Sequence, residues 1–437
     1  MATAAARPRG LGMAMALALV VGNMIGSGIY LLPATLAPFG WNQMAGWGVS
    51  LCGALGFAAV FARLSARLPL AGGPYAYADA AFGPLAGFVT AWSYWIMTWV
   101  GNGAIAVAVV SNLSLIVPAI GRVPGLAAVL ALVCVWLLTF VNIRGVKAAG
   151  RVQEVTVVIK VLPLLLLIGL ALWLLTSGAP RAPSPGVPLG FGPISAAAGL
   201  TFWGFLGLES ATVPADKIDD AASVVPRATA IGVAATAVIY IAISLAFALY
   251  MPIAEAAASP APIADFLGRR FGSGTGQGIA LFAAVSAFGA LNGWLLVQGE
   301  MPWAMAKGGV FPRWFAVESR FGTPLRGHLL SSSLLTMIVL LNYQKGMADL
   351  FGFIASISLA AGLLAYFASA LAALKLLPRT PGTVVAALIA ATFAVWAIWG
   401  LGAAADGYGL GLIALGLPVY AAIRRAAAFA PAAGLPG

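Results

Sequence analysis

Charged residues are scarce in this sequence, and their scarcity excludes a soluble domain. Asp, Glu, Lys and Arg make up 8% of the 437 residues, whereas hydrophobic residues make up 62%. A soluble surface needs about 25% charged residues in the chain. Apolar runs of about 20 residues, the length that crosses a bilayer, recur along the whole sequence. The composition therefore predicts a helical membrane protein with many spans.

Histidine, cysteine and nucleotide-binding motifs are also nearly absent. His328 is the only histidine, which excludes a histidine-rich metal site. Cys52 and Cys134 lie within apolar runs, where we expect them to pack as small apolar side chains. The sequence contains no P-loop and no dinucleotide fingerprint. We therefore expect no cofactor, no bound metal and no enzymatic activity.

The apolar runs predict one transmembrane domain over residues 1–437, with about twelve spans. These spans lie near 10–38, 44–66, 84–112, 124–142, 150–176, 195–218, 226–250, 276–306, 327–343, 347–373, 381–401 and 405–423. Pro- and Gly-rich stretches at 176–193 and 259–278 are predicted as outer connections. The fold class is thus an all-α polytopic membrane protein.

The formal net charge of +11 reflects how the chain is oriented in the membrane, and it does not indicate a nucleic acid partner. With the N-terminus inside, 17 of the basic residues fall on the cytoplasmic side and 5 on the outer side. An excess of Lys and Arg in cytoplasmic loops is typical of membrane proteins. We therefore expect a multi-pass protein of the bacterial inner membrane, with both termini cytoplasmic and the lipid bilayer as its surroundings.

Two of the predicted spans carry glycines where a membrane helix should be continuous. The first span contains "VGNMIGSGIYLLP" (21–33), and the sixth contains "FWGFLGLESA" (202–211). A pair of glycine-interrupted spans at corresponding positions points to the binding site of a transporter. The alternative is that these glycines only allow close helix packing.

Two crossed helix breaks can bind the head group of an amino acid. The N-terminal end of a half-helix carries spare N–H donors, which suit a carboxylate, and a C-terminal end carries carbonyls, which suit an ammonium. We expect Ser27 and Gly28 to bind the carboxylate. The carbonyls of Met24, Trp203 and Leu206 are expected to face the ammonium.

Six segments carry a resemblance to a known family. They are "GNMIGSGIYLLP", "AGGPYAYADAAFGPLAGF" (71–88), "YWIMTWVGN" (94–102), "FWGFLGLESATVP" (202–214), "GALNGWLLVQGEMPWAMAKGGVFP" (289–312) and "FGFIASIS" (351–358). Together they resemble the amino acid–polyamine–organocation superfamily, and within it the basic amino acid/polyamine antiporters of the bacterial arginine/agmatine type. The resemblance implies a LeuT-type inverted repeat with broken first and sixth spans. Residues 10–176 would form the first five-helix repeat, residues 195–373 the inverted second, and residues 381–423 the last two spans.

The resemblance also implies roles for individual side chains. Trp294 would support the substrate side chain, Trp203 would cover it, and Tyr94 would act as an outer gate. Asn102 and Ser356 would contact the distal end of the substrate, and Asn23 would lie at the first break. Glu209 would control gating in response to pH. Alternatively, its carboxylate simply accepts hydrogen bonds from backbone N–H groups freed by the break.

Some positions depart from the arginine/agmatine pattern. Met97 replaces a small residue, Thr98 replaces a cysteine and Asn292 replaces a glycine, so the pocket for the side chain is narrower. Lys160 stands where those antiporters have an apolar residue, and other branches place a lysine there instead of a sodium ion. Alternatively, Lys160 extends toward the cytoplasm. Glu300, near the end of the eighth span, has no assigned role.

The resemblance implies a secondary amino acid antiporter that works by alternating access. The small-molecule substrate would be an amino acid or its decarboxylated amine, and a homodimer is a further expectation. The alternative is proton-coupled or sodium-independent uptake of neutral amino acids, which Lys160 and Met97 favour. A receptor or channel is a weaker hypothesis, because paired broken helices suit an occluded site better than an open pore.

Overall fold

Helices form nearly all of the described chain. The computed structural model describes residues 12–26, 28–68, 72–144, 163–183, 186–212 and 218–428. These residues contain no strand, and an isolated bridge joins Glu318 and Pro324. The all-α prediction is confirmed for this part of the chain.

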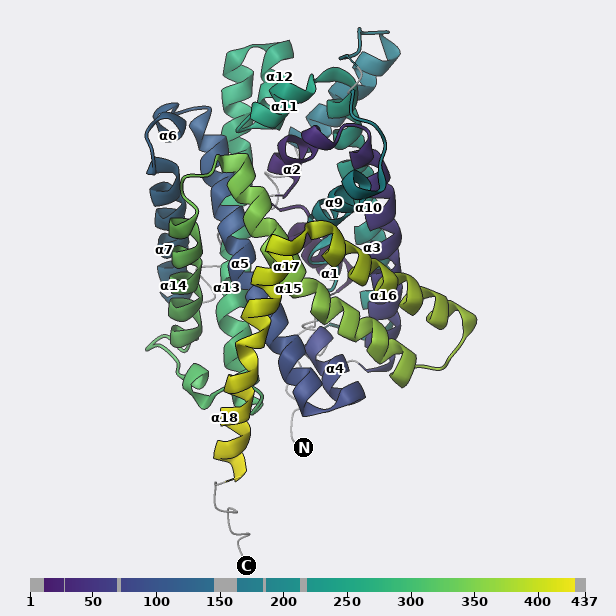
Figure 1. Ribbon diagram of the computed structural model, residues 1–437, viewed down its shortest axis with the longest axis vertical. Coiled ribbons are helices and arrows are strands. Elements are labelled where there is room, and N and C mark those ends of the chain that lie inside the picture. The colour runs from purple at the N-terminus through teal and green to yellow at the C-terminus, as the bar shows by residue number, and fades with distance from the viewer. Residues whose placement is uncertain are drawn as a thin grey trace, which may run out of the picture.

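Figure 1 shows the α-helices of the described residues in chain order from purple to yellow. Their bounds are α1 Met13–Met24, α2 Gly28–Leu36, α3 Asn42–Arg67, α4 Pro74–Phe82, α5 Pro84–Ser114, α6 Ala119–Arg122, α7 Leu126–Arg144, α9 Phe191–Phe202, α10 Ala221–Tyr250, α11 Ile253–Ala258, α12 Pro262–Phe271, α13 Ser273–Lys307, α14 Leu325–Leu341, α15 Met347–Leu376, α16 Pro381–Leu401, α17 Ala403–Ala414 and α18 Gly416–Ala428. A further apolar helix covers Pro163–Thr176. Short 3-10 turns cover Ala37–Phe39, Trp203–Phe205 and Arg313–Ala316.

Within the described ranges, eight helical segments are long and apolar enough to cross a membrane. They are Asn42–Arg67, Pro84–Ser114, Leu126–Arg144, Ala221–Tyr250, Ser273–Lys307, Met347–Leu376, Pro381–Leu401 and Ala403–Arg425. Gly28–Phe39, Pro163–Thr176 and Leu325–Leu341 are apolar but shorter. The structure therefore confirms a multi-pass membrane protein, and the number twelve stays a prediction.

Helix α5 lies at the centre of the molecule and packs against α13 and α15. In Figure 1, α7 and α14 stand at one edge, while α16 projects at the opposite edge. Helices α11 and α12 lie at the upper end of this view, and α4 and α18 lie at the lower end. The surface of the outer helices is apolar, with Val129, Val238 and Leu388 more than half exposed. A bilayer is the solvent that suits such a surface.

A chain of polar side chains joins four helices inside this bundle. Asn102 Nδ2 in α5 donates to Gln298 Oε1 in α13 at 2.9 Å, and Gln298 Nε2 donates to Ser332 Oγ in α14 at 3.0 Å. The Ser332 hydroxyl lies 2.7 Å from the hydroxyl of Thr139 in α7. Polar side chains that pair across helices fix how those helices pack in an apolar surrounding.

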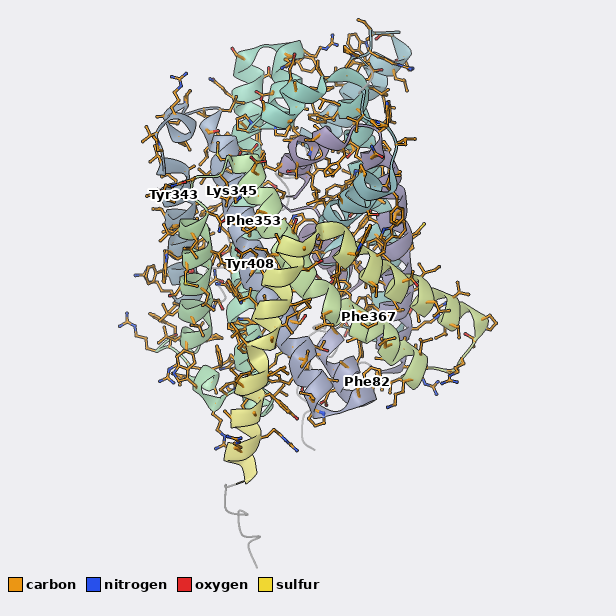
Figure 2. All side chains as sticks on the ribbon, viewed as in Figure 1. Phe82, Tyr343, Lys345, Phe353, Phe367 and Tyr408 are labelled. Atoms are coloured by element: carbon orange, nitrogen blue, oxygen red, sulfur yellow. The ribbon has the colours of Figure 1, made fainter. Side chains whose placement is uncertain are left out.

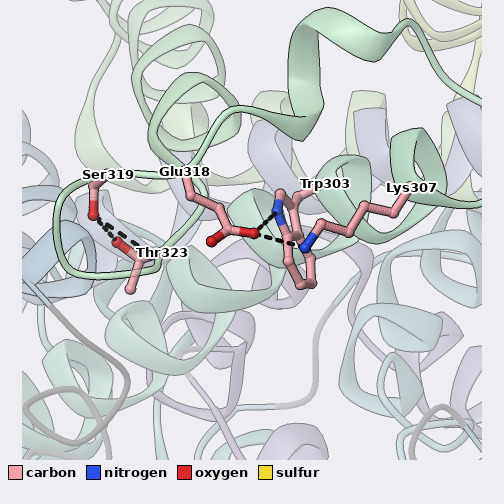
Figure 3. A network of polar contacts seen from close by, with 5 residues as sticks. All are labelled: Trp303, Lys307, Glu318, Ser319 and Thr323. Atoms are coloured by element: carbon pink, nitrogen blue, oxygen red, sulfur yellow. Dashed lines mark hydrogen bonds and ion pairs between the residues drawn. The ribbon is translucent and has the colours of Figure 1, made fainter.

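A polar network joins the end of α13 to the connection before α14 (Figure 3). Lys307 Nζ lies 2.6 Å from Glu318 Oε1 and 4.0 Å from the centre of the Trp303 ring. Trp303 Nε1 donates to the same carboxylate at 3.2 Å. The Ser319 and Thr323 hydroxyls lie 2.7 Å apart. They lie 3.2 and 2.5 Å from the carbonyl oxygen of Ile143 at the end of α7, and the hydroxyl that accepts within the pair can donate to this oxygen.

We expect this network to weaken as the pH falls. The hydrogen bond and positive charge of Lys307 lower the pKa of Glu318. A carboxyl whose pKa is lower in the folded state contributes stability at neutral pH, which is lost as the pH falls through that folded pKa. A Glu318→Gln variant should therefore melt slightly below the wild type at pH 7, and this difference should vanish at acidic pH. The effect is small because the pair is solvent-exposed, and a melting difference that grows toward acidic pH would contradict it.

Candidate functional site

The first helix break separates α1 from α2. Helix α1 ends at Met24, and Ile25 leaves the helical conformation with a ψ of 79°. Helix α2 begins at Gly28. Residue Ser27 lies outside the described residues, so its predicted contact with a carboxylate stays a prediction.

The second break follows α9. After the 3-10 turn Trp203–Phe205, Leu206 is extended with a ψ of 134°. Gly207 then has a φ of +100°, a conformation that side chains with a Cβ rarely adopt. A Cβ at Gly207 would lie 2.9 Å from the Cβ of Asn23, so the backbone of the second break is packed directly on the first.

Three hydrogen bonds hold the breaks in place. Asn23 Nδ2 in the first break donates to Ser210 Oγ in the second at 2.8 Å. The Tyr240 hydroxyl in α10 donates to the Met24 carbonyl oxygen at 3.0 Å, and the Gly26 N–H donates to the same oxygen at 2.9 Å. The Met24 carbonyl, which we predicted to face an ammonium, therefore already accepts two hydrogen bonds.

A cavity lies where the breaks meet α5, α13 and α15. The described residues around it are Asn23, Met24, Gly26, Gly28, Met97, Thr98, Gly101, Ile105, Trp203, Leu206, Trp294 and Ser358. Eight of these are predicted site residues, namely Asn23, Met24, Gly28, Met97, Thr98, Trp203, Leu206 and Trp294. The fold thus gathers most of the predicted residues around one space.

Three residues predicted to contact the substrate do not line the cavity, and their side chains bond elsewhere. The Tyr94 hydroxyl donates to Glu209. Asn102 is fully buried and donates to Gln298. Ser356 donates to the carbonyl oxygen of Gly352 in its own helix. Lys160 lies outside the described residues, so its role stays a prediction.

Sequence reasoning missed three of the lining residues in α5 and α15. Gly101 and Ile105 follow Met97 by one and two helical turns. Residues spaced by four lie on the same face of a helix, so this spacing from Met97 predicts that both line the cavity. Ser358 lies in the motif "FGFIASIS", two positions after Ser356. Its hydroxyl donates to the Met97 carbonyl oxygen at 2.7 Å, which joins α15 to α5 beside the cavity.

The indole of Trp203 closes one side of the cavity and fits tightly there. A Cβ added at Gly28 would lie 2.5 Å from Trp203 Cδ1, and one added at Gly101 would lie 3.2 Å from Trp203 Cη2. The ring also makes an edge contact with Phe351, with 5.9 Å between the ring centres. Two glycines and one aromatic ring therefore fix where this indole lies.

Glu209 is buried at the second break and joins three parts of the bundle. Its carboxylate accepts a hydrogen bond of 2.6 Å from the Tyr94 hydroxyl of α5 and another from the Tyr366 hydroxyl of α15. The backbone of Gly207 lies close to this carboxylate. Both predicted roles, a bond to backbone freed by the break and a contact that changes in gating, are compatible with this position.

The lining favours an amphipathic small molecule. Indole, thioether and aliphatic surfaces face the cavity together with the polar groups of Asn23, Thr98 and Ser358. The residues around it include no carboxylate, so a cationic substrate would be held by aromatic faces and by carbonyl oxygens. Among the described residues no group of three or more His, Cys, Asp or Glu could hold a metal ion.

Comparisons with known proteins give a consistent result. A family model described as amino acid permease matches residues 11–413. The chain is 32% identical over 366 residues to the cadaverine/lysine antiporter of Escherichia coli K12, and 30% identical over 389 residues to a putative arginine/ornithine antiporter of Bacillus subtilis. Each alignment covers 82% of both chains. A putrescine transporter of Haemophilus influenzae is 28% identical, over 83% of this chain and 84% of its own.

Proposed function

The chain belongs to the amino acid permease family, and on this basis we propose that it exchanges a basic amino acid for a related amine. The predicted superfamily and its basic amino acid/polyamine antiporter branch are confirmed by the matches. In this proposal transport is by alternating access, with no enzymatic step. The protein would lie in the bacterial inner membrane with both termini cytoplasmic.

The observation that carries the proposal is the cavity at the contact of two broken helices. Half-helix ends offer N–H donors and carbonyl acceptors at one place. An amino acid presents a carboxylate and an ammonium, which these ends complement. The start of α2 at Gly28 would receive the carboxylate. The ammonium would lie by the carbonyls of Trp203 and Leu206, and it would compete with Tyr240 for that of Met24.

The substrate side chain would then extend between Trp203 and Trp294. An aromatic face attracts a cation by about 0.5–2 kcal/mol, which lets a lysine or diamine bind without a buried carboxylate partner. Met97 and Ile105 would contact its methylene groups.

Counterflow in proteoliposomes tests this function directly. Vesicles loaded with unlabelled lysine, arginine or cadaverine should accumulate external radiolabelled lysine or arginine, because each inward step is coupled to an outward one. Empty vesicles should accumulate little. No accumulation with any cationic substrate, at any pH between 5 and 8, would refute the cationic exchanger.

Replacing Trp294 with alanine should weaken the apparent affinity for a cationic substrate by about tenfold, since about 1.4 kcal/mol of cation–π and contact energy is lost. The measurement is the concentration dependence of counterflow. Trp173→Ala is the matched control, because that indole is 60% exposed on the outer surface. If both variants have the same apparent affinity for the cationic substrate, Trp294 does not contribute to the binding site.

A second candidate is the uptake of neutral amino acids. It is favoured by the apolar lining around Met97 and by the lack of an acidic side chain among the residues at the cavity. Competition separates the two functions. Neutral amino acids would block labelled lysine uptake only weakly in a basic amino acid exchanger, whereas they would themselves be transported under the second hypothesis.

A further inference from the structure

A crevice separate from the central cavity lies between the end of α3 and the connection from α15 to α16. Arg63 and Arg67 line it from α3, and Leu377, Thr380 and Thr383 line it from the other side. Phe82 and the neighbouring end of α15 lie toward the lower right in Figure 2. In the proposed orientation this end of the molecule faces the cytoplasm.

The crevice is strongly positive. Arg63 and Arg67 are exposed and lie one helical turn apart. Arg63 Nη1 donates to the carbonyl oxygen of Ala59 at 3.0 Å, which leaves its other donors for a ligand. No described acidic side chain forms an ion pair with either arginine. Two further exposed cations, Lys375 and Arg379, border this connection.

The start of α16 borders the same crevice. Thr380 caps this helix by accepting a hydrogen bond from the Thr383 N–H at 3.3 Å. A Cβ added at Gly382 would lie 3.3 Å from Arg63 Nη2, so the guanidinium lies over the first turn of α16. Pro381 has no N–H and the Thr383 N–H is already bonded by Thr380, so the Gly382 N–H is the donor of this first turn that can face an anion. The guanidinium of Arg63 and the first turn of α16 therefore lie together at one candidate anion site.

An apolar surface leads from this place toward the middle of the membrane. Helices α3 and α16 touch where a Cβ added at Gly56 would meet Ile389 Cγ2 at 3.0 Å. Beside this contact, Leu55 is 48% exposed, and Val385 and Leu388 are 55% and 53% exposed. Such a surface accommodates acyl chains directly above the positive crevice.

We propose that this crevice binds the phosphate head group of an anionic phospholipid, with its acyl chains along α3 and α16. Arginine binds phosphate through paired N–H donors, and basic pockets between membrane helices are suited to lipid head groups. A free phosphate compound would share the head-group contacts only. The continuous apolar surface favours the lipid over that source.

The test is lipid binding to the purified full-length protein, measured by native mass spectrometry and by thermal shift. Phosphatidylglycerol should bind the wild type about tenfold more tightly than phosphatidylcholine and should raise its melting temperature. An Arg63→Ala/Arg67→Ala variant should lose this preference. The matched control is Arg424→Ala/Arg425→Ala, which removes two exposed charges from α18. This control variant should keep the preference for phosphatidylglycerol. Melting in phosphatidylcholine reports whether each variant folds.

Three results would overturn the proposal. The first is an equal loss of the phosphatidylglycerol preference in the control variant, which would indicate that net charge alone attracts the lipid. The second is an unchanged preference in the Arg63/Arg67 variant. The third is full displacement of the lipid by glycerol phosphate at equal concentration, which would assign the crevice to a soluble phosphate compound. If the double variant does not fold, Arg67→Gln replaces it, because Arg67 forms no ion pair with any described acidic residue.

Discussion

Replacing Glu209 with alanine should abolish exchange and destabilise the protein by roughly 2–4 kcal/mol. The Glu209 side chain is fully buried and accepts hydrogen bonds from Tyr94 and Tyr366. Its removal leaves two buried hydroxyl donors without an acceptor, and each such donor costs about 1–3 kcal/mol. It also disconnects the second break from α5 and α15. Thermal unfolding and counterflow measure the two effects.

The Glu209→Gln variant separates the charge from the hydrogen bonds. The amide oxygen can still accept from Tyr94, and the amide nitrogen can donate to the Tyr366 hydroxyl. We expect this variant to keep its stability to within about 1 kcal/mol and to show a flatter dependence of exchange on pH. Tyr366→Phe serves as the control that removes one hydrogen bond and keeps the carboxylate. Full exchange activity in Glu209→Ala would show that the contacts of Glu209 are not needed for transport.

Replacing Gly28 with alanine should reduce exchange by at least about tenfold, equivalent to about 1.4 kcal/mol. The added Cβ would lie 2.5 Å from Trp203 Cδ1 and 2.9 Å from its Nε1, so the indole must move. Phe351 and Gly101 confine the ring on other sides, and a displaced indole would intrude on the place proposed for the substrate. The measurement is counterflow, with melting temperature to verify folding.

Gly48→Ala is the matched control for Gly28→Ala. Gly48 also lies in a helix, but a Cβ there meets no atom within 4 Å. Alanine in place of glycine in a helix stabilises it by about 0.5–1 kcal/mol, so this variant should transport normally and melt no lower than the wild type. Normal exchange by Gly28→Ala would contradict the tight packing of Trp203 at the site.

The helix breaks could be predicted from local signals, whereas Met97, Thr98 and Trp294 at the cavity were implied by the family resemblance. Gly28 and Gly207 mark the breaks because a membrane helix otherwise avoids such interruptions. Gly101 and Ile105 follow Met97 at a spacing of four residues and complete the face of α5 that lines the cavity. Ser356 shows where this reasoning stops. The motif identifies the segment, but the rotation of α15 places Ser358 at the cavity.

The sequence by itself determined the class of protein, the helix breaks and the kind of group that two breaks can bind. These features depend on composition and on neighbours within a few residues, where backbone geometry and solvation act directly. Only the tertiary structure decided which distant side chains meet. Glu209 lies 115 positions from Tyr94 and 157 from Tyr366, yet it bonds both. The rotation and register of packed helices set such contacts, and these come from the sum of many small packing contacts that no local pattern encodes.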